Sequence, residues 1–151
     1  MTEVSYQEQL KRTKRWYEIF QQLNQGLEHE KNSEFYKDYV YSFFQNCYHL
    51  KDWLKNDKSI KIDKEELEVF VNNCKGMKIC KGICNGSKHL ISKNPRIGES
   101  SYFMVLEAGK KPVISVKYNI EANGESQDAF SLASECMREW QYFFKKNNLI
   151  Y

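Results

Sequence analysis

One stretch of the chain, Cys74 to Ile97, combines positive charge with groups capable of acid–base chemistry. It has six basic residues and no aspartate or glutamate, whereas the whole chain of 151 residues has a formal net charge of +3. The stretch supplies +6, so the remainder is about −3. Its basic residues are Lys75, Lys78, Lys81, Lys88, Lys93 and Arg96. Such an excess of lysine is either a solvated face or a binding site for an anion, and the sequence leaves both open.

His89 is the side chain in this stretch best suited to proton transfer, because the unperturbed pKa of histidine lies near neutrality. Metal-independent RNA cleavage needs a base for the 2′-OH proton and a cation that stabilises the phosphorane. The candidate catalytic residues are therefore His89, Lys81 and Lys88. The candidate ligand-binding residues are Asn85, Ser87, Lys88, Lys78, Arg96, Asp52 and His49. The alternative is that a histidine beside a turn is structural or solvated.

His49 and Asp52 lie three positions apart on a predicted helix, hence on neighbouring faces. Both would approach the basic stretch if this helix packs antiparallel to the next. The favoured interpretation of Asp52 is architectural. Its carboxylate would pair with Lys88 or accept hydrogen bonds from the backbone of residues 85–87, while Trp53 fills the core.

Zinc is a further possibility, because Cys74, Cys80, Cys84 and His89 are four potential ligands. Structural zinc sites usually pair their ligands at short spacing, and only Cys80 and Cys84 form such a pair. These two share a helical face with apolar neighbours, where a free cysteine behaves as a small hydrophobic residue. A cysteine nucleophile would lack a clearly placed base. The sequence therefore predicts neither a metal nor a cofactor.

Composition indicates a single globular domain over residues 1–151, since 41% of the residues are hydrophobic and 15% aromatic. The N-terminus carries charges where a signal peptide needs an apolar core, and no apolar run is long enough for a membrane span. Five cysteines, an odd and scattered set, fit a reducing compartment. We expect a cytoplasmic protein with reduced cysteines and no membrane contact.

Hydrophobic periodicity predicts four helices, at about 2–28, 33–56, 64–84 and 127–147. The second has the cleanest apolar stripe, formed by Tyr36, Val40, Phe43, Cys47, Leu50 and Leu54. Asp63 is the expected N-cap of the third helix, whose later lysines would suit its negative end. Gly76 and Gly82 predict a kink or a close helix approach in that helix.

The period changes to two after Pro95, which predicts a β-hairpin of strands Ser101–Glu107 and Pro112–Glu121. Asn123-Gly124 is a second turn, and Ser126 is expected to cap the last helix. A hairpin alone is marginal in water, so it must lean on the helices. The fold class is α+β, mainly α, with the hairpin inserted before the C-terminal helix.

Two motifs carry a resemblance to known proteins. The pattern FFxxCxxLxDWL (Phe43 to Leu54), followed by CKGICNGSKH (Cys80 to His89), resembles small bacterial and phage proteins of unassigned function, which are in turn similar to the HEPN group of helical domains. The resemblance spans roughly residues 35–148 and implies a four-helix HEPN-like arrangement. HEPN proteins often dimerise, and many are RNases of toxin and anti-phage systems. Lys81 and Gly82 replace the arginine and polar residue of their motif, and the gap to His89 is longer.

The resemblance implies a HEPN-like binding or regulatory domain in a toxin–antitoxin or phage-defence setting, with a basic NGSKH loop for an anionic ligand. One alternative is an active metal-independent endoribonuclease toxin that uses His89 with Lys81 or Lys88. Another is a protein-interaction module, an inhibitor or immunity partner, without ligand chemistry. The expected partners are RNA or another phosphate-bearing ligand, a protein, and a second copy in a homodimer.

Overall fold

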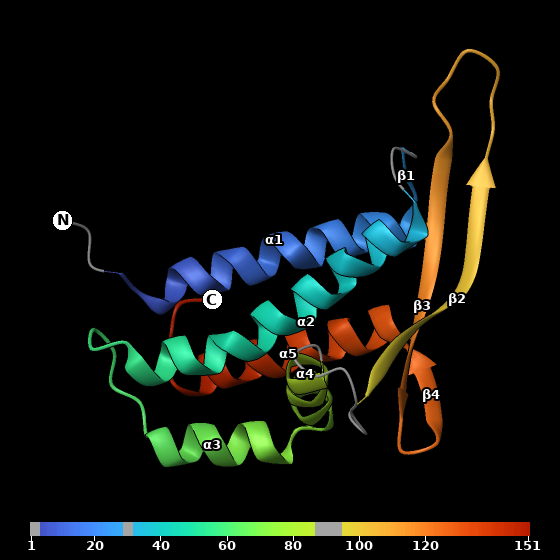
Figure 1. Ribbon diagram of the computed structural model, residues 1–151. Coiled ribbons are helices and arrows are strands. Elements are labelled where there is room, and N and C mark those ends of the chain that lie inside the picture. The colour runs from blue at the N-terminus through green and yellow to red at the C-terminus, as the bar shows by residue number, and fades with distance from the viewer. Residues whose placement is uncertain (1–3, 29–31, 87–94) are drawn as a thin grey trace.

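The computed structural model describes residues 4–28, 32–86 and 95–151, and within them the chain is α+β and mainly helical. The helices and the antiparallel sheet lie at different ends of the molecule (Figure 1). The helices are α1 (Tyr6–Gln25), α2 (Ser33–Asn56), α3 (Lys64–Asn73), α4 (Lys75–Gly86) and α5 (Ala129–Lys146). The strands are β1 (Leu27–Glu28), β2 (Arg96–Val105), β3 (Val113–Ala122) and β4 (Glu125–Asp128).

The expectation of four helices is wrong, because the predicted third helix is two. Cys74 has extended backbone angles (φ −78°, ψ 122°) and ends α3, while its carbonyl accepts the first hydrogen bond of α4 from the Lys78 amide at 3.0 Å. The sequence placed Lys75, Lys78 and Lys81 near the end of one long helix. They instead belong to a separate helix, α4, whose first residue is Lys75. A HEPN-like four-helix arrangement is not confirmed.

Helix starts follow the expected chemistry in most places. The side chain of Asn32 accepts from the Phe35 amide and caps α2, and Asp63 accepts from two amides and caps α3, as predicted. The predicted cap at Ser126 is wrong, because residues 125–128 form β4 and Asp128 caps α5 instead. The Asn123-Gly124 turn is confirmed by positive φ angles of 53° and 77°.

The core lies between α1, α2, α4, α5 and the sheet, and the predicted apolar stripe of α2 is wholly buried. On β3 alternate residues point inward, as the period of two predicted; they are Ile114, Val116, Tyr118 and Ile120. Trp140 of α5 is fully buried, and its indole N–H donates to the Cys47 carbonyl of α2 at 3.1 Å. This bond ties two central helices together at the level where α4 also packs.

The hairpin is longer than predicted, and it extends well beyond the helices (Figure 1). β3 is central, flanked by β1 and β2, and β4 also pairs with it. The end of the hairpin away from the helical body exposes large apolar side chains, which are Tyr102, Phe103, Met104, Val105, Leu106 and Val113. The prediction that the hairpin leans on the helices is therefore confirmed for β3, whose inward face is buried from Ile114 to Ile120, whereas the second half of β2 is exposed.

Candidate functional site

The outward face of α4 is a stripe of exposed lysines, called the basic face below. Lys75, Lys78 and Lys81 recur every three positions, so they lie on one side of the helix. The opposite side is buried, and it consists of Gly76, Met77, Ile79, Cys80, Ile83 and Cys84. The buried side fixes the orientation of the helix and therefore holds the three ammonium groups on a common surface.

No ion pair or hydrogen bond with another described residue involves the side chains of these three lysines. Other lysines of the chain are paired, such as Lys51 and Lys55, which share Glu68 at 3.5 and 3.2 Å. No acidic residue lies between residues 74 and 97 to neutralise the stripe locally. The basic face therefore retains positive potential.

Arg96 lies at the edge of the basic face because Pro95, the residue before it, packs against α4. Pro95 packs on Gly82, so closely that a Cβ built on Gly82 would lie 2.5 Å from the Pro95 Cδ. Gly82 is four positions after Lys78 and so belongs to the same side of α4. The close approach predicted from this glycine is thus confirmed, and it brings the start of β2, with the exposed Arg96, beside the basic face.

Of the other predicted site residues between Cys74 and Ile97, some lie within the described structure and some lie outside it. Lys81 and Asn85 are exposed, on the last two turns of α4. Ser87, Lys88 and His89 lie outside the described residues, so the metal-independent RNase hypothesis stays a prediction.

His49 lies close to α4, as expected if the two helices approach each other. Its Nε2 is 3.6 Å from the Sγ of Cys84, although the ring is largely exposed. Asp52 instead lines a shallow groove against the start of α1, beside Ser5 and Tyr6. Within the described part of the chain no hydrogen bond or ion pair involves its carboxylate, so the expected bonds from the backbone of residues 85 and 86 are not formed, while Ser87 and Lys88 lie outside the described residues.

Trp53, expected in the core, is only partly buried. It packs at the edge of the core, where the Arg12 guanidinium lies 5.7 Å from the centre of its ring. The predicted contribution of this tryptophan to the interior is therefore wrong, and it covers the α1–α2 contact instead.

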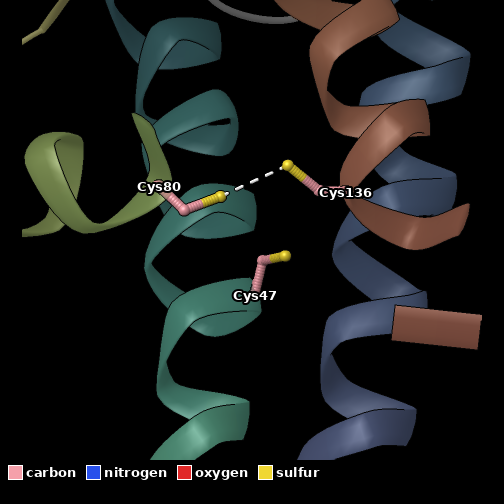
Figure 2. A group of neighbouring side chains, drawn as sticks. All are labelled: Cys47, Cys80 and Cys136. Carbon is pink, nitrogen blue, oxygen red and sulfur yellow. Dashed lines mark hydrogen bonds between the residues drawn. The ribbon is translucent and has the colours of Figure 1, made fainter. Parts of the chain in front are cut away.

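Behind the basic face, three cysteine thiols converge in the interior (Figure 2). Cys47 of α2, Cys80 of α4 and Cys136 of α5 place all three sulfur atoms within 4.8 Å of one another. The Sγ atoms of Cys80 and Cys136 are 3.5 Å apart. All three side chains are fully buried, and all five cysteines of the chain are free. We call these three residues the thiol cluster.

The three thiols of the cluster shift one another's pKa values in opposite directions. Burial alone would raise the pKa of Cys47, but hydrogen bonds from the other two thiols and the Trp140 indole lower it to about 5. Burial raises the pKa of Cys80 well above its usual value, and the hydrogen bond with Cys47 does the same for Cys136. The Cys47 thiol is therefore the most acidic of the three.

Glu139 of α5 lies next to the thiol cluster and faces the first residues of α4. Its carboxylate accepts hydrogen bonds from the amides of Gly76 and Met77, while its Oε2 is buried without a hydrogen-bond partner in the described chain. A Cβ on Gly76 would lie 2.9 Å from the Cys136 Sγ and 3.0 Å from this Oε2. Burial, followed by the charge of Glu135, raises the pKa of Glu139 to about 7. Glycine at position 76 is what allows α5 to approach α4 this closely.

Sequence reasoning missed the thiol cluster, although it recognised the cysteines. Its zinc candidates were Cys74, Cys80, Cys84 and His89, all local in sequence. The structure confirms that Cys80 and Cys84 are buried, but it joins Cys80 to cysteines of two other helices. The available signal was that Cys47 fell on the core stripe of its helix; no spacing rule connects it to Cys136.

Fold and surface together define a mainly helical α+β protein with a positively charged face over a sulfur-lined interior. No family model matches the chain, and no similar protein was found among curated proteins or solved structures. Among the described helices, none has the length and apolar content needed to cross a membrane.

Proposed function

We propose that the chain is a binding domain for a phosphate-bearing polymer, RNA first of all, and that the basic face of α4 is the contact surface. The observation that carries the proposal is the stripe Lys75, Lys78 and Lys81, exposed and without ion pairs to the described residues. Ammonium groups in such a row follow a phosphate backbone and release its counterions. Because the other side of α4 is buried, little order has to be gained on binding.

The biological setting is part of the same proposal. The resemblance of the Phe43–Leu54 and Cys80–His89 motifs to HEPN-like bacterial and phage proteins supports a binding or regulatory role in a toxin–antitoxin or phage-defence system. A cytoplasmic location is in keeping with five free cysteines.

The test is the salt dependence of binding to single-stranded RNA, with Lys78→Ala/Lys81→Ala as the variant. Each phosphate contact contributes about −0.7 to the slope of log K against log salt, so losing two contacts should reduce the slope by about 1.4. We expect at least a tenfold weaker affinity near physiological salt. The matched control is Lys11→Ala/Arg15→Ala, which removes two exposed charges from α1.

Equal loss in the control, or an unchanged affinity in the α4 variant, would overturn the assignment of the surface. The same reactions run in EDTA also report strand cleavage. Cleavage that survives EDTA and disappears in His89→Ala would establish the RNase alternative in place of simple binding.

The exposed end of the hairpin favours a second role, contact with another copy of the chain. β2 is an edge of the described sheet, and Phe103, Val105 and Leu106 are each more than half exposed. An edge strand with apolar side chains can pair antiparallel with its own copy about a twofold axis, which is the commonest symmetry of homodimers. Phe103→Asp should therefore convert a dimer to a monomer in sedimentation equilibrium, whereas Tyr142→Asp, an exposed aromatic on α5, should not.

A further inference from the structure

The thiol cluster differs from an ordinary set of buried cysteines in the direction of its side chains. A structural cysteine in a core normally faces hydrocarbon, as a small hydrophobic residue does. Here three helices bring their sulfur atoms within 4.8 Å of one another, and those of Cys80 and Cys136 are turned toward each other (Figure 2). The Cys80 and Cys136 sulfurs, 56 residues apart in the chain, lie 3.5 Å from each other. Sulfur atoms from three helices therefore lie together in the interior.

Three sulfur atoms at this spacing suit one class of ligand. Thiolate sulfur selects soft ions such as Cu(I), zinc and iron in iron–sulfur clusters. Structural zinc is almost always tetrahedral with four ligands. In the described chain no fourth histidine, cysteine, aspartate or glutamate atom joins the cluster within the 4.8 Å that spans it. Cu(I), which is stable with three sulfur ligands, needs no fourth donor.

Charge leads to the same ion. The site is fully buried, so a complex with little net charge is favoured. A monovalent cation forms a neutral complex when only one of the three thiols gives up its proton on binding. A divalent ion would require a second thiol to ionise against burial.

We propose that Cys47, Cys80 and Cys136 form a three-sulfur binding site for a soft monovalent metal ion, Cu(I). The ion binds without any change in oxidation state, and the proton that a thiol loses when it coordinates the ion passes to solvent. The site is separate from the basic face, because it lies on the opposite side of α4. The proposal therefore does not depend on RNA binding.

The experiment is anaerobic titration of the reduced protein with Cu(I) against a chromophoric Cu(I) chelator. Wild type should take up one equivalent. Cys47→Ser, Cys80→Ser and Cys136→Ser should each lose at least tenfold in affinity, whereas Cys74→Ser and Cys84→Ser should bind as wild type. Failure of wild type to compete, or equal loss in the two control variants, would overturn the site.

A second measurement needs no variant and covers the case in which a cluster variant does not fold. X-ray absorption of wild type loaded with one Cu(I) should show three sulfur neighbours and no nitrogen. A nitrogen neighbour would overturn the proposal in favour of the Cys84–His49 pair, whose atoms are 3.6 Å apart. Zinc binding that excludes Cu(I) in a parallel titration would also overturn it.

Discussion

The two faces of the short helix α4 lie in opposite environments, one in water and one in the core. Outward, three lysines spaced by three residues keep their charge in water, each without an ion pair to the described chain. Inward, Cys80 meets two other thiols where no water reaches. The outward face is a property of twelve consecutive residues, while the inward face exists only because α2 and α5 pack against it. The first kind of site can be found in a sequence, and the second cannot.

The largest expected difference between the two faces is in stability. Ile83→Ala removes a fully buried side chain and should lower the free energy of unfolding by about 2–5 kcal/mol. Lys81→Ala, two residues away on the exposed side, should change it by less than about 0.5 kcal/mol. Urea denaturation of both variants measures the comparison. If the two substitutions cost the same, α4 is not packed as described.

Gly76→Ala should give a smaller effect that reports on the contact between α4 and α5. Alanine normally stabilises a helix by about 1 kcal/mol relative to glycine. Here its Cβ would lie 2.9 Å from the Cys136 sulfur and 3.0 Å from Glu139, so we expect a net destabilisation of about 1–3 kcal/mol. Thermal melting measures it. Gly98→Ala, where a Cβ would meet nothing within 4 Å, is the control, and a stabilised Gly76→Ala would contradict the close contact.

The smallest expected effect is the pH dependence that Glu139 contributes. Its pKa is raised from 4.5 to about 7, so the folded protein binds this proton more tightly than the unfolded chain does. Its stabilising contribution is complete below pH 4.5 and is lost as the pH rises through 7. Glu139→Gln should flatten this decline in urea midpoints measured from pH 4.5 to 8.

Glu125→Gln, at an exposed position of β4, is the matched control and should leave the pH profile unchanged. A profile that Glu139→Gln does not alter would show that its carboxylate is solvated in the native protein.

Local sequence signals predicted a large part of the fold. The apolar stripes of α2 and β3, the cap at Asp63 and the Asn123-Gly124 turn could be predicted because each depends on neighbours within a few residues. The break at Cys74 was predicted only in part. Gly76 indicated a kink in one long helix, but the division into two helices two residues earlier was not expected.

The candidate sites show the same difference between local patterns and tertiary contacts. The basic face was predictable because charge spacing on a helix is a local pattern. The cap at Asp128 was missed because β4, a strand of only four residues, occupies the position expected for the helix start. The thiol cluster was missed because the partners of Cys80 lie on α2 and α5, and sequence separation carries no information on which buried cysteines meet.

The indole of Trp140 gives the interior an intrinsic optical signal. It is fully buried and bonded to the Cys47 carbonyl at 3.1 Å, whereas Trp16 and Trp53 are only partly buried. Its fluorescence should therefore lie toward the blue edge of the emission band. A heavy ion a few ångströms away would quench that edge selectively, so occupancy of the cluster can be followed in unlabelled protein.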